Sequence, residues 1–186
     1  MPNIIGGKYK RTKINIPNNL VRPTSALKRE AIFSVIESFS IRNSIEIYKN
    51  KSIIDIFAGS GLIGLEAISR GMSMSYFIEN DNSVAKILEE NCKKICKNQE
   101  YKIILREAIT ALEQSFKIKP SIIFIDPPYK KENINLILIK ILEKKIKIRN
   151  TIIIIETGRK EKVRIPKELT IFKEKNYGKT KLLFIN

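Results

Sequence analysis

The segment "FIDPPYKK" combines residue types that chemistry on a nucleobase requires. Asp126 ends an apolar run and is followed directly by Pro127, Pro128 and Tyr129. Proline fixes its own φ and holds the preceding residue extended, so the two prolines set the direction of the Asp126 carbonyl. Neither proline carries an N–H, and the loop therefore presents acceptors beside an aromatic ring. Such a loop suits a base with an exocyclic –NH2 group, with Tyr129 stacking on the base.

A second segment, "DIFAGSGLIGLEA", indicates a phosphate- or nucleoside-binding turn. Gly59, Gly61 and Gly64 form a G-x-G-x-x-G pattern, where the chain must turn tightly while its backbone approaches a ligand. Glu79 follows 20 residues after Gly59, and its carboxylate can accept hydrogen bonds from ribose hydroxyls. Together they predict a nucleoside-bearing cofactor. A turn that only packs a helix on a strand is the alternative.

The glycine pattern alone fits both NAD and S-adenosylmethionine. Asp55, four positions before Gly59, favours S-adenosylmethionine, because an acid suits its ammonium group and would repel a pyrophosphate. Glu107 and Ala108 follow a third apolar run and are candidates for contact with adenine. A favourable acid in the first turn of a helix explains Glu107 equally well.

An exocyclic amine next to a methyl donor indicates methyl transfer to the amine nitrogen. The amine is a poor nucleophile because its lone pair is delocalised into the ring, and fixed acceptors on its hydrogens can free that pair toward the sulfonium methyl. The amine becomes acidic as it is methylated, so the Asp126 carboxylate can accompany proton loss in a chain without histidine. A simple aspartate-proline turn at a strand end is the alternative for this segment.

A parallel sheet would position both segments. From residue 52 onward, short β-branched runs alternate with segments of helical length, which is typical of a parallel sheet with helices on both faces. The carboxyl ends of such strands meet at one edge, so the glycine loop and Asp126 should face one cleft. The predicted strands are 52–57, 74–79, 101–106, 121–126 and 151–156. The predicted helices between them are 60–70, 82–97, 107–116 and 132–145.

Smaller elements are expected at the two ends of the chain. The runs around "NYG" predict a terminal antiparallel hairpin. Residues 4–17 read as a basic hairpin or extended arm, and 24–39 as a helix capped by Thr24 or Ser25.

Length and composition predict one domain. A chain of 186 residues can bury one sizeable core, and we see no flexible linker. We expect a single methyltransferase domain over 1–186, with an arm at 1–21 and a catalytic core at 22–186. No apolar run approaches the length of a membrane span, and the start lacks a signal-peptide pattern, so we expect a cytoplasmic protein. No apolar surface stripe stands out, and a monomer is the default.

The charge of the chain predicts a polyanionic partner. Lys and Arg total 35 against 19 for Asp and Glu, giving a net charge of +16. Such a balance points to nucleic acid, although a compositional bias toward lysine also contributes to it. Cys92 and Cys96 are spaced to share one apolar helix face, and without histidine or further ligands they are expected to be buried thiols rather than a metal site.

The residues resemble a known family. The chain is similar to the class I S-adenosylmethionine-dependent methyltransferases and, within them, to the bacterial 16S rRNA (guanine(966)-N(2))-methyltransferase family. The segments "IIGGKYKRTKINIP", "VRPT" followed by "RE", "DIFAGSGLIGLEAISRG", "FIEND", "FIDPPY" and "IIIIET" carry this resemblance nearly from end to end. It implies an α/β, Rossmann-like fold with a seven-stranded, mostly parallel sheet, and methyl transfer from S-adenosylmethionine to the N2 amine of a guanine in small-subunit rRNA. An assembling 30S particle is the expected context.

The resemblance also implies roles for particular residues. The residues expected to hold S-adenosylmethionine are Asp55, Phe57, Gly59, Ser60, Gly61, Glu79, Asn80, Glu107 and Ala108. The residues expected to hold the guanine are Asp126, Pro127, Pro128 and Tyr129. The residues expected to contact RNA are Arg22, Thr24, Lys8, Lys10 and Arg11. For Arg22, a surface charge preceding a helix is the alternative.

The chain departs from the family at one place. Between "RPT" and "RE" the family usually has an acidic and then a basic residue, whereas this chain has Ala26, Leu27 and Lys28. This puts the substrate-side contacts of the segment in question. Alternative functions are an adenine-N6 methyltransferase acting on RNA or DNA, a protein-glutamine methyltransferase, whose motif has Asn in place of Asp126, and a nucleic-acid-binding protein with a lapsed active site.

Overall fold

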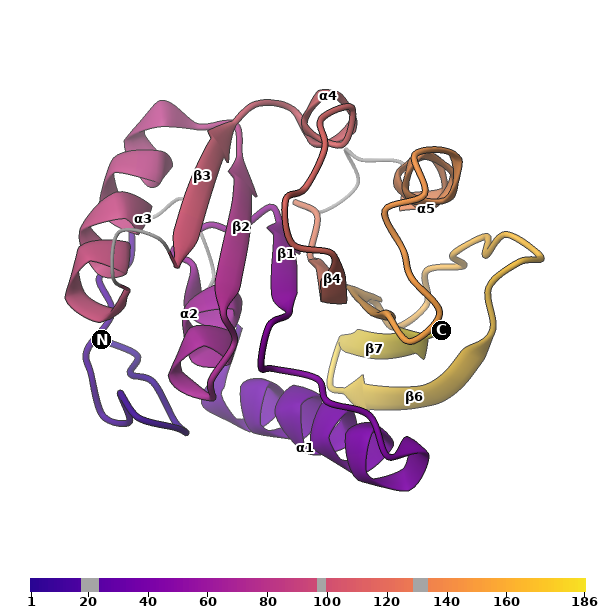
Figure 1. Cartoon of the computed structure of the whole chain (residues 1–186), viewed down its shortest axis with the longest axis horizontal. Helices are drawn as coiled ribbons and strands as arrows, with labels where there is room; N and C mark the ends of the chain where they lie inside the picture. Colours follow the sequence, from indigo (N-terminus) through magenta and orange to yellow (C-terminus); the bar gives the residue numbers. More distant parts are fainter. Residues whose placement is uncertain (18–23, 97–99, 129–133) are drawn as a thin grey trace.

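The sheet predicted from the alternating runs is present in the structure. The computed structural model describes residues 1–17, 24–96, 100–128 and 134–186. They contain a seven-stranded sheet with the strand order β3-β2-β1-β4-β5-β7-β6 (Figure 1). The strands are β1 (Ser52–Ile56), β2 (Met74–Glu79), β3 (Tyr101–Leu105), β4 (Pro120–Ile125), β5 (Ile152–Gly158), β6 (Ile171–Tyr177) and β7 (Thr180–Ile185). The helices are α1 (Ala26–Asn43), α2 (Leu62–Ser69), α3 (Asn82–Ile95), α4 (Ala108–Ala111) and α5 (Ile134–Glu143).

Helices cover both faces of the sheet. The helices α1, α2 and α3 lie on one face, and α4 and α5 lie on the other (Figure 1). Strand β5 shows how a continuous apolar run serves both layers: Ile154 packs into the core under α1, while Ile153 and Ile155 pack into the core under α5. Successive side chains of a strand point to opposite faces, so a strand covered on both sides needs no polar alternation.

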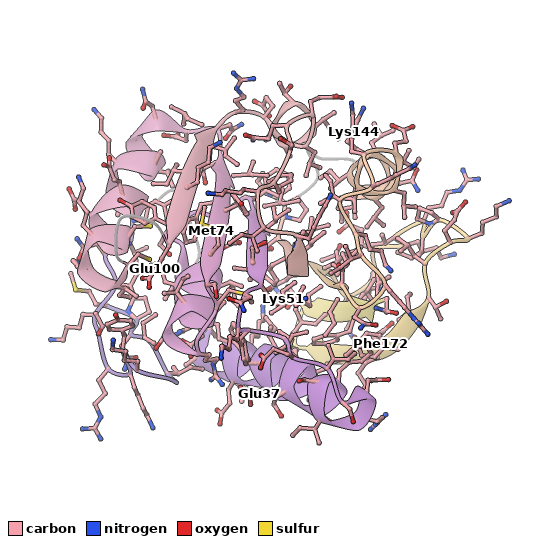
Figure 2. All side chains as sticks on the ribbon, viewed as in Figure 1. Glu37, Lys51, Met74, Glu100, Lys144 and Phe172 are labelled. Carbon is pink, nitrogen blue, oxygen red and sulfur yellow. The ribbon has the colours of Figure 1, made fainter. Side chains whose placement is uncertain are left out.

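The direction of the strands changes only at the end of the chain. Strands β1 to β5 pair in parallel, while β7 is antiparallel to both β5 and β6. The predicted α/β sheet with a terminal antiparallel hairpin is therefore confirmed. Phe172 of β6 lies beside α1 (Figure 2), and its ring centroid is 4.9 Å from that of Phe39.

Local capping chemistry sets where two of the helices begin. The Asp81 carboxylate accepts hydrogen bonds from the backbone N–H groups of Ser83 and Val84, at 2.7 and 3.2 Å, as an N-cap should. For α1 the cap is Ser25, whose hydroxyl accepts from the Lys28 N–H at 3.3 Å. Of the two predicted caps, Ser25 rather than Thr24 is therefore the one that serves.

The predicted helix 107–116 was too long, since α4 ends at Ala111. The apolar spacing that suggested a longer helix continues to Phe116, but this ring belongs to an irregular segment. It packs edge-on against Tyr76, with ring centroids 5.0 Å apart. A contact with a strand distant in sequence thus overrides the local helical pattern. The other predicted elements differ from those observed by small shifts at their ends, except that residue 97 of the helix 82–97 and residues 132–133 of the helix 132–145 lie outside the described residues.

The N-terminal segment forms a short hairpin rather than an extended arm. Asn3 and Lys13 form an antiparallel bridge, and the Ile4 N–H donates to the Thr12 carbonyl at 3.0 Å. Ile4 and Ile14 are fully buried in the core on the side of α1 and α2. This hairpin is therefore part of the folded unit, and its apolar side chains anchor it.

Cys92 is a buried thiol, as predicted, and Cys96 is half-buried. The pKa of the Cys92 thiol is raised, chiefly by its hydrogen bond with the Cys96 side chain and secondly by burial. Across the part of the chain that the structure describes, no group of three acidic, cysteine or histidine side chains is placed to hold a metal ion. Within the same residues, no helix is long and apolar enough to cross a membrane.

Candidate active site at the carboxyl edge of the sheet

The ends of three neighbouring strands bring the two sequence motifs together. The Ala58 N–H, after β1, donates to the Ile78 carbonyl of β2 at 3.0 Å, so the glycine loop crosses the end of β2. On the other side of β1, the Asp126 N–H lies 3.5 Å from the Ile56 carbonyl. The predicted meeting of the glycine loop with Asp126 at one sheet edge thus agrees with the geometry. In doubly wound sheets this edge is where ligands bind.

The glycine loop has a backbone that few side chains permit. Gly59 and Gly61 have φ values of 55° and 79°, in the left-handed region, and Phe57 also has a positive φ of 64°. The φ of Gly61 favours glycine, and a Cβ atom there would lie 2.4 Å from Cδ1 of Leu88, which would have to move. Phe57 carries a side chain, so its positive φ strains the backbone. Backbone strain of this kind concentrates at binding sites.

Glu79 organises the loop on the side of β2. One carboxylate oxygen accepts from the Gly59 N–H at 2.9 Å, and the other accepts from the N–H groups of Asn80 and Asp81 at 2.9 and 3.0 Å. The Asn80 amide in turn donates to the Glu107 carboxylate at 2.8 Å. Each carboxylate oxygen has two lone-pair directions, so the oxygen bonded by Gly59 can still accept from one hydroxyl group of a ligand.

Asp55 lies beneath the glycine loop. Its side chain is buried, and its Oδ2 atom accepts a hydrogen bond from the Gly64 N–H at 3.0 Å, at the start of α2. Burial raises the pKa of Asp55 well above its usual range, and the charges of Asp126 and Glu79 raise it further, whereas the Gly64 hydrogen bond lowers it. In this arrangement the carboxylate holds the loop onto the helix. Its contact with a cofactor ammonium stays a prediction.

Asp126 has an unusual electrostatic environment at the end of β4. Burial raises the pKa of its carboxyl to about 8, and the charge of Glu156 contributes in the same direction, while Lys28 lowers it. Lys28 of α1 forms an ion pair with Oε1 of Glu156 in β5. Sequence reasoning treated Lys28 only as a departure from the family pattern, and it did not single out Glu156.

Some predicted residues lie elsewhere or cannot be placed. Arg22 and Tyr129 lie outside the described residues. Thr24 is half-buried, and its carbonyl accepts from Nε of Arg29 at 3.3 Å, so its observed contact is with the protein itself. Ala108 is buried among the apolar residues under α4. Pro127 and Pro128 follow Asp126 directly at the sheet edge, where Pro128 is exposed.

The basic N-terminal hairpin is docked on the end of α2. The Lys8 N–H donates to the Ser69 carbonyl at 2.7 Å, and the Ser69 hydroxyl donates to the Gly6 carbonyl at 2.6 Å. The side chains of Lys8, Lys10 and Arg11 are exposed. The hairpin thus presents a basic tip while its backbone is fixed to the core.

A buried glutamate fastens the base of this hairpin. The Glu66 carboxylate, fully buried in α2, accepts from the N–H groups of Ile5 and Gly6 at 2.9 and 2.7 Å. It also pairs with Arg29 at 3.3 Å and with Arg70 at 3.1 Å. Burial lowers the pKa of Arg29, although the Glu66 charge opposes that shift. The network joins the hairpin, α1 and α2 at one point.

Asn91 is a buried residue beside the glycine loop that the motifs did not single out. It is fully buried in α3, and its side-chain amide donates to the Ser60 carbonyl at 3.0 Å and to the Asn15 carbonyl at 2.9 Å. Its Oδ1 atom accepts from the Asn15 N–H at 2.8 Å. One side chain therefore connects the glycine loop to the end of the N-terminal hairpin. A polar residue on the apolar face of α3 was the available signal.

A surface cavity lies at the outer side of the sheet. It has a volume of about 520 Å³ and flanks the edge strand β3 and α4. Its lining residues are Lys102, Ile103, Ile104, Leu105, Arg106, Thr110, Glu113 and Gln114. It contains none of the residues that hold the glycine loop or Asp126, and an open concavity beside a sheet edge does not by itself define a site. We therefore assign the candidate site from side-chain chemistry and strand topology.

The fold is Rossmann-like, and the similarity of the chain to curated relatives makes it a methyltransferase of this class. The Escherichia coli protein yhhF has a similar structure, with a TM-score of 0.82 and 23% sequence identity, over 98% of this chain and 96% of that one. The methyltransferase domain of METTL16 is also similar, with a TM-score of 0.71 and 19% identity, over 92% of this chain and 71% of that one. At these identities the likeness concerns the fold.

The sequence then identifies the family. Residues 2–186 match the family described as Conserved hypothetical protein 95, and the chain belongs to this family. Ribosomal RNA small subunit methyltransferase D of Buchnera aphidicola subsp. Acyrthosiphon pisum is 33% identical over 175 residues, 92% of this chain and 86% of the relative. The Haemophilus influenzae protein of the same name is 27% identical over 179 residues, 94% of this chain and 88% of the relative. The family resemblance predicted from the motifs is confirmed.

Proposed function

We propose that this protein transfers a methyl group from S-adenosylmethionine to the exocyclic N2 amine of a guanine in small-subunit rRNA. The observation that carries the proposal is the placement of Asp126 at the end of β4, next to the strand whose end bears the glycine loop. The proposal is supported by relatives that are named as small-subunit ribosomal RNA methyltransferases. An assembling small subunit is the proposed context.

The glycine loop and Glu79 fit S-adenosylmethionine. The positive φ angles at Gly59 and Gly61 bring main chain without side chains to the sheet edge. Glu79 offers carboxylate oxygens beside that loop, as ribose hydroxyls require. Asn80 and Glu107, already joined by a hydrogen bond, lie toward β3, where the adenine would be held. Bound there, S-adenosylmethionine would supply an electrophilic methyl group on a positively charged sulfur.

Asp126 would hold and activate the amine. The Asp126 carboxylate and the backbone carbonyls before the prolines accept the hydrogens of N2, which directs the nitrogen lone pair toward the methyl group. As the new nitrogen–carbon bond forms, N2 becomes acidic and gives up a proton. A carboxylate whose pKa is raised to about 8 is a stronger base than an ordinary aspartate and is suited to receive that proton near neutral pH.

The N-terminal hairpin would contact the RNA backbone. Lys8, Lys10 and Arg11 are exposed on a hairpin that Glu66 and Ser69 fix to the core. Basic side chains can neutralise phosphates and position RNA without reading its sequence. The net charge of +16 is consistent with a large anionic substrate.

The proposal is tested by identifying the modified nucleoside. The purified protein is incubated with methyl-labelled S-adenosylmethionine and, separately, with naked small-subunit rRNA, small ribosomal particles or DNA. The RNA or DNA is then digested to nucleosides and analysed by chromatography and mass spectrometry. We expect N2-methylguanosine from rRNA or particles and no product from DNA. N6-methyladenosine as the product, or labelling of DNA alone, would contradict the proposal.

A further inference from the structure

Glu156 has a buried carboxylate oxygen that is not paired. The residue lies near the end of β5 and is 7% exposed. Its Oε1 atom is paired with Lys28, but its Oε2 atom is buried and has no hydrogen-bond partner among the residues that the structure describes. Removing a charged oxygen from water without a partner is costly, so such an atom calls for an explanation. A donor supplied by a ligand would satisfy it.

The position of Glu156 puts this oxygen on the substrate side of the site. Ile125 of β4 pairs with Ile155 of β5, so Asp126 and Glu156 each follow directly after these neighbouring positions. The charge of Glu156 also raises the pKa of Asp126, as expected for acids that follow paired positions of neighbouring strands. In the strand order, β4 lies between β5 and β1, so Asp126 separates Glu156 from the glycine loop. The cofactor is proposed to lie at the glycine loop, so Glu156, on the other side of Asp126, faces the base rather than the cofactor.

The two acids lie on neighbouring strands, where both can face one edge of the same purine. Neighbouring strands lie about 4.8 Å apart, and the side chains of Asp126 and Glu156 extend from two such neighbours. In guanine, the N1–H group and the N2 amine lie side by side on the Watson–Crick edge, and both are donors. In adenine, N1 carries no hydrogen and is an acceptor. A carboxylate next to the amine-holding acceptors therefore favours guanine and repels adenine.

We infer that Glu156 Oε2 accepts a hydrogen bond from N1–H of the target guanine and that this contact selects guanine over adenine. The inference rests on the proposed function, whose amine acceptor is Asp126, and it adds a specificity-determining residue. Lys28 has a positioning role: its ion pair with Oε1 fixes the Glu156 side chain and leaves Oε2 free for the base. Through its ion pair with Glu156, Lys28 of α1 would act on the substrate side of the site.

The inference can be tested with a guanine analogue whose N1 carries no hydrogen. 2-Aminopurine keeps the amine at position 2 but has an unprotonated N1, so it cannot donate to Glu156. RNA substrates are prepared with guanine or 2-aminopurine at the position methylated in the experiment above. The ratio of their kcat/KM values is measured for the unaltered protein and for Glu156→Gln. The amide of glutamine is nearly isosteric with the carboxylate and can donate to an unprotonated N1.

The unaltered protein should prefer guanine by about 100-fold, since a site built to bind a donor rejects an analogue that lacks it. In Glu156→Gln the preference should fall at least tenfold, because the amide suits 2-aminopurine and no longer suits guanine. 2-Aminopurine also lacks O6, so the change in the ratio, rather than the ratio itself, isolates Glu156. Glu113→Gln, an exposed acid on the α4 side that pairs with lysines, is the matched control and should leave the ratio unchanged.

Each outcome bears on the inference. If Glu156 were only structural, Glu156→Gln would lower both kcat/KM values together and leave the ratio unchanged, which overturns the inference. A tenfold weaker binding of S-adenosylmethionine to the variant, measured by calorimetry, would place Glu156 at the cofactor and also overturn it. Equal use of guanine and 2-aminopurine by the unaltered protein overturns it without any variant. If the unaltered protein makes no N2-methylguanosine at all, the proposed function fails first, and the inference fails with it.

Discussion

The side-chain amide of Asn91 donates a hydrogen bond to the backbone carbonyl of Ser60, in the glycine loop, at 3.0 Å. The same side chain exchanges two hydrogen bonds with the backbone of Asn15. The loop that is predicted to hold the cofactor and the hairpin that is predicted to contact RNA are thereby fixed to one buried group. A change at this group should therefore affect both.

Replacing Asn91 by leucine should destabilise the protein by about 3 kcal/mol, because the backbone groups of Ser60 and Asn15 lose their buried partner. Affinity for S-adenosylmethionine should fall as the loop loosens. Urea denaturation and calorimetric titration measure the two effects. Lys86→Ala, at an exposed position of the same helix, is the control and should change stability by less than about 0.5 kcal/mol. Unchanged stability in Asn91→Leu would mean that other groups hold the loop.

Asp126→Ala should abolish methyl transfer while leaving S-adenosylmethionine binding largely intact. The carboxylate lies at the end of β4, beyond the glycine loop, and is proposed to hold the base rather than the sulfur. A loss of activity of at least about 1000-fold is expected, as for other groups that position and deprotonate a reacting atom. Turnover and cofactor Kd are measured on the same preparation. Undiminished turnover would remove Asp126 from the proposed chemistry.

The activity should depend on the ionisation of Asp126. Burial and the Glu156 charge raise the pKa of this carboxyl to about 8, so it is largely protonated in the free protein at pH 6. A protonated carboxyl cannot accept from the amine with both oxygens. We expect kcat/KM to rise with pH and to level off above about pH 8. Lys28→Met removes the charge that lowers this pKa, and the profile should move to higher pH.

The same shift has a consequence for stability. The pKa of Asp126 is higher in the folded protein than its ordinary value of 3.8, so its ionisation opposes folding. Its contribution to the free energy of unfolding is fully present below about pH 4 and is lost as pH rises through about 8. Asp126→Asn should therefore be more stable than the unaltered protein at pH 8.5, by on the order of 1 kcal/mol, and the difference should vanish near pH 4. An unchanged difference across this range would contradict the raised pKa.

Replacing Glu66 by glutamine should destabilise the protein by about 3 to 5 kcal/mol, because Arg29 would be left as a buried charge without its acid. The N-terminal hairpin should also become susceptible to protease, since the Glu66 carboxylate holds the N–H groups of Ile5 and Gly6. The comparison is Glu37→Gln, which removes an acid that is 42% exposed and also pairs with Arg70. That change should cost less than about 1 kcal/mol.

The basic hairpin should contribute affinity for RNA but not the chemistry. The double substitution of Lys8 and Lys10 by alanine should weaken RNA binding uniformly across sequences. It should also reduce the slope of log Kd against log salt concentration by about 1 for each lysine that contacts a phosphate. At saturating RNA the kcat should be unchanged. Lys144, at the end of α5 in the opposite layer, provides the control (Figure 2). An equal effect of Lys144→Ala would show that only the net charge matters.

The sequence by itself determined the sheet, the glycine loop and the sheet edge at which Asp126 and Glu79 lie. These features follow from local rules: β-branched runs covered on both faces, glycines where φ must be positive, and acids directly after strands. Even the N-terminal hairpin could be expected from its own residues. The length of α4 could not, because the contact of Phe116 with Tyr76 decides it.

Only the tertiary structure decided which polar side chains support the site. Asn91 meets Asn15 across 76 positions of sequence, and Lys28 meets Glu156 across 128. In the sequence, Asn91 is one polar residue of a helix and Glu156 is the acid at the end of a strand. Their roles depend on which elements pack together and on burial that makes each polar partner costly to lose. No spacing rule encodes such pairs, since only the folded chain places one partner against the other.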